Sequence, residues 1–503
     1  MIQKIRPRFK ALTVALAGSI CLASCGSMKD QDQVHVTVIE DSDPVIKPVG
    51  IDLNYASATA RAAIAKGLVG FDEEGRVVPA LAARWIVTDD GLSYIFRLNE
   101  AKWDDGRQIT SDRIERLLRQ RVRELRSSRL GPDLEAIEEI VSMTGRVIEI
   151  QLKSPRPNFL QLMAQPEMGL LRAGNGAGPM SELDNGKLYK LGIFNYAPSE
   201  NVEGDGEQQR DQITSDPRQI TLRSERAAMA LARYTSGHTN LVLNGHFHHL
   251  PLVDEAGISS NDLRLDPVAG LFGLQFIKTD GFWSLPQNRA ILSMAIDRPA
   301  LLTSFPKVTA WQSRLKIIPD ALNVSGINAR PNWADMTMTE RQQYAREHVR
   351  RWEALEGQVA PLTIALPDAT GADILFLRIQ SDLRRAGLDA RQVALGEEAD
   401  IRLIDEIAPY DSAQWFLSRL TCSQTPVCLN DADDIIAQAN AEVNLQTKAR
   451  LFAEAEVLLV RHYGFIPLAV PVRWSIIKPA ARGFAVNQRG WHPLNFLVGI
   501  PIS

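Results

Sequence analysis

The first half of the chain carries apolar positions with both strand and helix spacing. Residues 34–39, 93–98 and 147–152 alternate apolar and polar side chains, as half-buried strands do. Between the last two, one helical face gathers Ile114, Leu117, Leu118, Val122 and Leu125. Asp112 precedes this face and is predicted to cap the helix, with Glu115 three residues further on. A further helix is expected over residues 56–68.

The second half alternates short apolar runs with amphipathic segments. Strands are predicted over residues 362–366, 393–395 and 401–404, and helices over 372–386 and 448–462. Gly387 marks the end of the first of these helices. Because strands that alternate with helices form parallel sheets with covered faces, this half is expected to be α/β. The acidic, polar stretch 200–219 is predicted to be a surface loop.

The first residues have the features of an export signal. A basic head is followed by the apolar run 11–20, which is too short for a stable membrane span, and then by Leu22-Ala23-Ser24-Cys25. This ending resembles the bacterial lipobox, which implies cleavage after residue 24 and a lipid on Cys25. A plain signal peptide with an incidental cysteine is the alternative. No later run of about 18 apolar residues follows, so a tethered, soluble chain is expected.

Composition excludes several classes of protein. The 503 residues are 45% hydrophobic and 23% charged, which is ordinary for a globular protein large enough for two or three lobes. Basic residues number 56 and acidic residues 60, so the chain is no polycation built to hold nucleic acid. Removal of residues 1–24, with four basic residues and no acid, changes the net charge from −4 to about −8.

Four cysteines are too few for a fold that depends on disulfides. Cys21 leaves with the signal and Cys25 is the predicted lipid site, which leaves Cys422 and Cys428. Export places this pair in an oxidising compartment, so a local disulfide is predicted. A metal-binding pair is the weaker alternative, because no other cysteine remains to complete a thiolate site.

Sequence motifs for catalysis are missing. The chain contains no nucleophile elbow, no P-loop and no paired-histidine zinc helix, so we expect a protein that is not an enzyme and has no cofactor. The glycine-rich run 174–178 lacks the full dinucleotide fingerprint and is predicted to be a turn.

Half of the eight histidines lie close together. His238, His246, His248 and His249 fall within 12 residues. If residues 246–248 formed a strand, His246 and His248 would point to the same side, a geometry that suits a transition metal. An exposed loop with chance histidines is the simpler interpretation, and both remain open.

Residues 67–114 carry an ordered set of motifs. In sequence order these are Pro79-Ala80-Leu81-Ala82, Trp85, Asp90-Gly91, Tyr94, Phe96, Leu98, Asp105-Gly106 and Asp112. The set resembles the signature of extracellular solute-binding protein family 5, the peptide- and nickel-type receptors of ABC importers. Weaker matches follow in family order at residues 155–159, 176–180, 289–298, 454–456 and 465–468. Asp90-Gly91 and Asp105-Gly106 also have a local meaning, as turn signals between strands.

The resemblance implies a two-lobed α/β fold of the periplasmic-binding-protein type, known as type II or Venus-flytrap, with a subdomain inserted in lobe I. The expected parts are a signal peptide (1–24), a tether and first part of lobe I (25–54), the inserted subdomain (55–164), lobe I continued (165–270), lobe II (271–472) and a return to lobe I (473–503). The chain is expected to cross between lobes near residues 268–273 and 470–476. Lobe closure about such a hinge buries the ligand.

The resemblance also suggests where a ligand binds. In peptide-binding relatives an acidic residue before a turn holds the ligand's free amine, and Pro409 occupies that position here. Asp405, Glu406 and Asp411 are candidate substitutes. Trp283, Tyr410, Trp415 and Tyr55 are candidate aromatic walls, because large flat side chains bury much ligand area with few torsions to restrict.

The function implied is that of an exported, lipid-anchored, monomeric receptor of the cell envelope or periplasm. It would capture a short peptide or peptide-like solute and present it to an ABC permease in the inner membrane, without any nucleic-acid partner. Two alternatives remain: a receptor for a metal or metallophore that uses His246 and His248, and an envelope lipoprotein that no longer serves transport.

Overall fold

The computed structural model describes residues 33–41, 45–103, 105–143, 145–174, 176–182, 189–193, 219–478 and 483–499. Side chains are described for all of these except residues 189–193 and 498–499. The predicted signal peptide, Cys25 and nearly all of the polar stretch 200–219 lie outside these ranges. Among the described helices, none is both long enough and apolar enough to cross a membrane.

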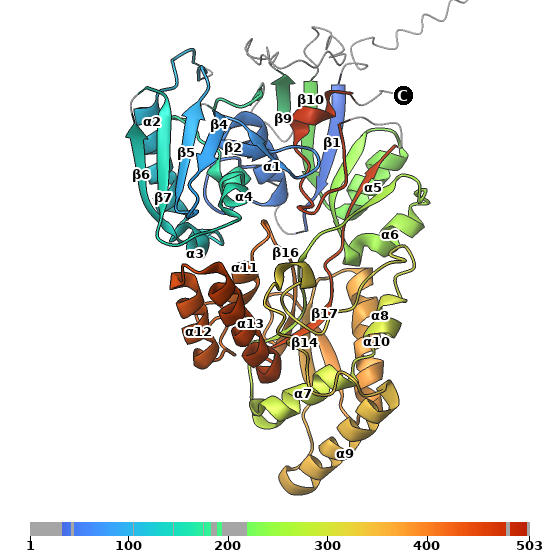
Figure 1. Ribbon diagram of the computed structural model, residues 1–503. Coiled ribbons are helices and arrows are strands. Elements are labelled where there is room, and N and C mark those ends of the chain that lie inside the picture. Colours follow the sequence, from blue (N-terminus) through green and yellow to red (C-terminus); the bar gives the residue numbers. More distant parts are fainter. Residues whose placement is uncertain are drawn as a thin grey trace, which may run out of the picture.

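Lobe I is built on a seven-stranded sheet, in the upper part of Figure 1. Its strands in spatial order are β12 (Leu263–Asp266), β18 (Arg473–Ile477), β11 (Leu241–His246), β1 (Gln33–Ile39), β10 (Gln219–Glu225), β9 (Tyr189–Ile193) and β8 (Met180–Glu182). Strand β1 confirms the alternating pattern over 34–39 and runs parallel to both β10 and β11. The helices of this lobe include α1 (Tyr55–Ile64), α5 (Ala227–Thr235) and α6 (Leu250–Glu255).

Helix α1 is shorter than the predicted helix 56–68 and belongs to the lobe I sheet. Its alanines Ala56, Ala60 and Ala63 pack with valines of β1 in one buried cluster. The expected subdomain boundary at residue 55 therefore falls ahead of a helix that shares its core with lobe I.

The inserted subdomain is a four-stranded antiparallel sheet covered by a helix, at the left of Figure 1. The sheet order is β4 (Ala82–Val87), β5 (Ser93–Leu98), β7 (Val147–Leu152) and β6 (Ile137–Met143), with α2 (Ser111–Leu125) against it. Strands β5 and β7 and the helix were predicted, whereas β4 and β6 were not. Gly91 and Gly106 have the positive φ values, 68° and 81°, that their turns require. Small elements of this region are β2 (Val69–Phe71), β3 (Val77–Pro79), α3 (Gly131–Leu134) and α4 (Phe159–Met163).

The predicted cap of this helix is wrong by two residues. Thr110 is the N-cap, and Asp112 lies in the first turn. The Asp112 carboxylate instead accepts a hydrogen bond from the Ser142 hydroxyl of β6 at 2.7 Å. The acid thus ties the helix to the sheet.

Lobe II contains a five-stranded sheet, in the lower part of Figure 1. The order is β15 (Ala390–Ala394), β14 (Leu362–Leu366), β16 (Ile401–Ile407), β13 (Gly270–Phe276) and β17 (Phe465–Ala469). Strand β14 pairs in parallel with β15 and β16, as the alternation of strands and helices predicts. The helices are α7 (Pro286–Ala295), α8 (Arg298–Leu302), α9 (Met338–Glu356), α10 (Thr370–Arg385), α11 (Ala413–Ser418), α12 (Asn430–Ala441) and α13 (Leu445–His462).

Two short segments connect the lobes. The chain leaves the lobe I sheet after β12 and enters the lobe II sheet at β13, so it crosses over residues 267–269. It returns over residues 470–472, between β17 and β18. Because β12 pairs with β18 and β13 pairs with β17, the two crossings run side by side. This confirms the two-lobed α/β architecture with its paired hinge.

Candidate functional site

A cavity of about 420 Å³ lies between the two lobes. Lobe I contributes residues from α1, β11 and β18 and from the segment 489–491, and lobe II contributes β16, α11 and residues near them. The carboxyl ends of the parallel strands β1 and β11 meet at one edge of the sheet, and His246 at the end of β11 lines the cavity. The volume is within the range of small-ligand sites. The lining residues are Leu53, Tyr55, Ala58, Phe71, Arg129, Gln165, Pro166, Asn244, His246, Asp405, Glu406, Ile407, Pro409, Trp415, Arg419, Arg473, Arg489, Gly490 and Trp491.

One wall of this cavity joins the lobes through Asp405, and we call His246, Asp405 and Arg473 the hinge wall. Arg473 of β18 donates to Asp405 Oδ1 at 2.8 Å and to the Asp405 carbonyl at 3.0 Å. His246 Nδ1 lies 3.1 Å from Asp405 Oδ2. Although burial alone would raise it, the neighbouring Arg473 and His246 hold the pKa of Asp405 well below its usual range. The carboxylate is therefore ionised and already paired.

His246 is held in its neutral form. Burial and the positive charge of Arg473 together lower the pKa of His246 to about 3. Because the Asp405 carboxylate is an acceptor, the His246 Nδ1–H donates to it and Nε2 keeps its lone pair.

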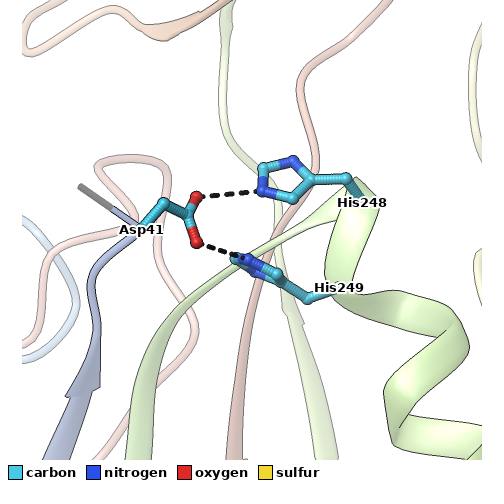
Figure 2. Close-up of side chains that lie close together, drawn as sticks. All are labelled: Asp41, His248 and His249. Carbon is cyan, nitrogen blue, oxygen red and sulfur yellow. Dashed lines mark hydrogen bonds and ion pairs between the residues drawn. The ribbon is translucent and has the colours of Figure 1, made fainter. Parts of the chain in front are cut away.

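A second acid lies behind this wall, between two adjacent histidines (Figure 2). Asp41 follows β1, and its two carboxylate oxygens contact His248 Nε2 at 3.0 Å and His249 Nε2 at 2.8 Å. His248 and His249 are buried, whereas Asp41 is exposed. Burial would raise the pKa of Asp41, but its two histidine partners bring the pKa far below the ordinary value.

The strand considered as one alternative for residues 246–248 does not form. Strand β11 ends at His246, and Phe247–His249 form the short 3-10 helix η2. Helix α10 of lobe II packs against η2, so closely that a Cβ atom on Gly371 would lie 2.5 Å from the His248 Cα. The turn still brings the His246 and His248 rings within 5.3 Å of each other.

Arginines outnumber acids on the cavity lining. Four arginines line it, against the two carboxylates of Asp405 and Glu406. Each arginine has an acidic partner: Arg419 pairs with Glu406 at 2.7 Å, Arg129 with Glu167 at 2.7 Å, and Arg489 with Asp411 at 2.9 Å. Glu167 and Asp411 lie outside the lining, so the surface facing the cavity is basic.

The aromatic wall comes from both ends of the chain. Tyr55 of α1 and Trp491 have ring centroids 5.1 Å apart, and the Tyr55 hydroxyl donates to the Gly490 carbonyl at 3.0 Å. Trp415 of α11 lines the cavity from lobe II. The cavity thus contains Tyr55, Asp405, Glu406 and Trp415 of the predicted ligand residues.

Three other predicted ligand residues lie outside the cavity lining. Trp283 is buried in the lobe II core against Phe276 and Phe282, with ring centroids 5.8 and 4.9 Å away. Tyr410 donates its hydroxyl to Asp133 of α3 and lines a second pocket. Asp411 also lines that pocket and holds Arg489.

The second pocket, of about 310 Å³, lies where the inserted subdomain meets lobe II. The Tyr410–Asp133 bond crosses this contact, and so does the Gln165 amide, which donates to the Pro409 carbonyl at 2.8 Å. Apolar side chains of the subdomain and of lobe II share one buried cluster here. We call this contact the subdomain wall.

Residues that the sequence reasoning missed complete the site. Arg473, Arg489 and Trp491 lie in the last 31 residues, far along the chain from the residues they contact. No local pattern marks them, because their partners become neighbours only when β18 returns to lobe I. Away from the cavity, the sulfur atoms of Cys422 and Cys428 lie 2.11 Å apart.

Comparisons with known proteins agree with this architecture. Residues 76–209 match the family model described as "Bacterial extracellular solute-binding proteins, family 5 Middle". The glutathione-binding protein GsiB of Shigella flexneri serotype 5b is 23% identical over 484 residues, which cover 86% of this chain and 89% of that protein. Over a shorter stretch of 73 residues, or 14% of each chain, the probable deoxycholate-binding periplasmic protein YgiS of Escherichia coli is 38% identical.

Solved structures share the fold at low sequence identity. The crystal structure of Haemophilus influenzae OppA in complex with the peptide RPPGFSPFR has a TM-score of 0.75 at 14% identity and covers 93% of this chain and 99% of that one. NikZ of Campylobacter jejuni in complex with Ni(L-His) has a TM-score of 0.70 at 16% identity and covers 93% and 98%. The family match over residues 76–209, the relatives along most of the chain and the shared two-lobed fold agree with one another: this chain is similar to the bacterial extracellular solute-binding proteins of family 5.

Proposed function

We propose that this protein is the solute receptor of an ABC importer, which captures a short peptide or peptide-like solute by lobe closure and presents it to a membrane permease. The observation that carries the proposal is a cavity of about 420 Å³ lined from both lobes, beside the two crossings that run side by side. Closure of such lobes assembles a complete site from two incomplete halves. Relatives named for glutathione, oligopeptides and a murein tripeptide support a peptide-like ligand.

The charges that line the cavity restrict the chemical class of ligand that it can bind. Asp405 is engaged by Arg473 and His246, and Glu406 by Arg419, so neither acid is free to hold an amine without breaking an ion pair. Pro409 offers no backbone N–H for a strand-like ligand to pair with. Arginine guanidinium groups recognise carboxylates well. The preferred ligand is therefore one with at least one carboxylate and with a blocked, distant or absent α-amine.

The same proposal covers the cellular setting. Residues 1–24 act as a signal peptide, Cys25 carries the lipid, and the receptor works as a tethered monomer in the cell envelope, with its permease in the inner membrane and no chemical change of the ligand. Support comes from the basic and apolar leader and from the family's extracellular role. The proximity of Cys422 and Cys428 supports a disulfide in such an oxidising compartment.

A binding screen with the full-length exported protein tests the proposal. Thermal unfolding is followed with tripeptides and tetrapeptides in four forms: free, N-acetylated, C-amidated and doubly blocked. A fitting ligand at 100 times its Kd stabilises the folded state by about 2.7 kcal/mol. Acetylated peptides are expected to bind at least as well as free ones, while amidation weakens binding.

Two variants, one inside the cavity and one outside it, test whether the cavity arginines hold the ligand. Arg419→Met removes a cavity cation and is expected to weaken a carboxylate ligand roughly tenfold, since charged hydrogen bonds contribute about 1.5–3 kcal/mol. Arg384→Met removes an exposed arginine of lobe II whose partner is Asp389 and serves as the control. Failure of every peptide form and of simple polar carboxylates to bind would refute peptide-like solute capture.

A further inference from the structure

The pocket at the subdomain wall has a lining of its own. Its volume of about 310 Å³ is within the range of small-molecule sites, and it shares no lining residue with the cavity between the lobes. The subdomain contributes residues of α3 and of the segment 155–162, and lobe II contributes residues of α11, α13 and the segment 318–324 (Figure 1). Solute capture between the lobes therefore leaves this pocket unexplained.

Most of the pocket wall is apolar. Phe159 of the subdomain and Ile318 and Phe452 of lobe II line the pocket and are buried. Two other lining residues, Val324 and Leu445, are 78% and 49% exposed. Large apolar side chains left in water beside a concave apolar surface are typical of a binding site. The wall therefore suits a ligand with an apolar body.

Two cations line the same pocket, and neither forms an ion pair with an acid among the described residues. The Lys448 ammonium makes one hydrogen bond in that part of the chain, to the Pro155 carbonyl at 3.1 Å. Arg156 donates to the amide oxygens of Gln414 and Asn440. Its Nε is buried and has no hydrogen-bond partner in the same described ranges. Both positive charges are thus met only by neutral oxygen atoms.

Burial makes this lack of an acidic partner costly. Lys448 is only 5% exposed, and burial together with the positive charge of Arg156 lowers the pKa of Lys448 to about 8. Burial also lowers the pKa of Arg156. Because a buried charge needs a partner of opposite sign, an anionic group placed beside these two side chains would stabilise both.

The two carboxyl groups on the lining are engaged elsewhere. Asp133 accepts a hydrogen bond from the Tyr410 hydroxyl, and Asp411 accepts one from Arg489 at 2.9 Å. Neither carboxylate lies within ion-pair distance of Lys448. The position beside the ammonium is therefore left for an anion that the described residues do not supply.

We propose that the pocket at the subdomain wall binds a small amphipathic carboxylate, with its carboxylate group at Lys448 and Arg156 and its apolar body against Phe159, Ile318 and Phe452. An ammonium and a guanidinium bind a carboxylate by charged hydrogen bonds, while the apolar wall removes the body of the ligand from water. The ligand contacts the subdomain and lobe II at once, so its binding favours the arrangement in which these parts are in contact.

Calorimetric titration of the full-length protein with octanoate tests the proposal without any peptide, so its outcome is independent of solute capture. One octanoate per chain is expected. Octanol, which has the same chain and no charge, should bind at least tenfold more weakly, because it cannot pair with the two cations. Saturating octanoate should also reduce the radius of gyration in small-angle scattering, and an increase would contradict a site shared by the subdomain and lobe II.

Two variants place the ligand in the pocket. Lys448→Met removes the ammonium but keeps an apolar side chain, and should weaken octanoate at least tenfold while the affinity for octanol changes less than threefold. Because Lys448 is buried, Leu445→Glu provides a second test at an exposed position. This acid lies in the first turn of α13, where a helix accepts it, and should weaken octanoate at least threefold by repulsion.

Matched controls and contrary outcomes complete the test. Leu377→Glu alters a leucine of α10 that is 61% exposed and lies outside the pocket, and Lys278→Met removes an exposed lysine of lobe II. Both should leave octanoate binding unchanged. Weaker octanoate binding in Arg419→Met, with full binding in Lys448→Met, would place the ligand in the cavity between the lobes and overturn the proposal. Equal affinities for octanoate and octanol, or no saturable binding of octanoate, would also overturn it.

Discussion

The two lobes contact each other along two walls with different chemistry. At the hinge wall, lobe I and lobe II are joined by charges: Arg473 reaches Asp405 at 2.8 Å, and His246 takes the other oxygen. At the subdomain wall, apolar side chains share one core, and the crossing polar contacts include Tyr410 to Asp133 and Gln165 to the Pro409 carbonyl. The hinge wall depends on complete pairing of its charged side chains. The subdomain wall depends mainly on the area of its apolar contact.

This difference teaches how the protein can be both closed and able to open. A buried ion pair is costly to leave half-made, so the hinge wall stays intact or fails as a unit. Apolar contact is spread over many side chains, so the subdomain wall loses stability in small steps. We therefore expect substitutions at the hinge wall to affect folding, and substitutions at the subdomain wall to shift the equilibrium between open and closed lobes.

The largest effect is expected from Asp405→Asn. The substitution leaves Arg473, whose side chain is only 7% exposed, without its charged partner. Removal of one partner of a buried pair costs about 3–5 kcal/mol. The measurement is the free energy of unfolding from urea titration.

Asp389→Asn is the matched control for Asp405→Asn. Asp389 pairs with Arg384 on the exposed surface of the same lobe, where such a pair contributes at most about 1 kcal/mol. Equal losses in the free energy of unfolding of the two variants would show that the ion pair at the hinge wall stabilises the protein no more than an ordinary surface pair.

Glu456 of α13, which lies behind the subdomain wall, is expected to make the free energy of unfolding depend on pH by about 3 kcal/mol. Burial raises the pKa of Glu456 from 4.5 to about 7, despite the N–H donors of Ile317 and Ile318. The folded state thus holds its proton more tightly than the unfolded state, so the free energy of unfolding falls as pH rises from about 4.5 to 7. Each unit of pKa shift corresponds to about 1.4 kcal/mol.

Glu456→Gln isolates this contribution, because the amide oxygen still accepts from Ile317 and Ile318 and does not titrate. Urea titrations between pH 4.5 and 7.5 should show a flatter profile in this variant than in the wild type. Glu454→Gln, at a partly exposed residue of the same helix, should keep the wild-type slope. A wild-type slope in Glu456→Gln would mean that another group controls stability in this range.

Tyr410→Phe is expected to cost about 1–3 kcal/mol. The hydroxyl donates to Asp133, which is buried, and burial raises the pKa of Asp133. Without the hydroxyl, one oxygen of a buried carboxyl group loses its donor. Tyr344→Phe, at an exposed tyrosine of α9, is the control and should lie within about 0.5 kcal/mol of the wild type. Equal losses of stability in the two variants would show that the Tyr410 hydroxyl does not stabilise the subdomain wall.

Much of the fold could be predicted from short-range patterns. The strands at 93–98 and 147–152 and the helix between them follow from side-chain periodicity, and the turns at Gly91 and Gly106 follow from backbone freedom. The lobes themselves came from the order of family motifs, since no local pattern says that β12 and β18 pair across more than 200 residues.

The site was harder to predict, for physical reasons. Asp405 and Trp415 were identified because their segment resembles a ligand-binding loop, but Arg473 carries no signal until β18 returns beside β11. An aromatic side chain gives no sign of the face it occupies, which is why Trp283 was expected in the cavity and lies in the core. The histidine pair was noticed from spacing, while the turn after β11 packs against α10, a segment more than 120 residues further along the chain that no local pattern connects with it.

The smallest effect is expected from Gln165→Met, which removes the donor to the Pro409 carbonyl but keeps the side chain's length. Loss of one such bond contributes about 1 kcal/mol, which corresponds to a roughly fivefold shift toward open lobes. Small-angle scattering without ligand should show a larger radius of gyration, and an excess of fitting ligand should restore the wild-type value. Gln120→Met on the exposed face of α2 is the control. If Gln165→Met lowered the free energy of unfolding as much as Asp405→Asn without opening the lobes, the distinction between the two walls would fail.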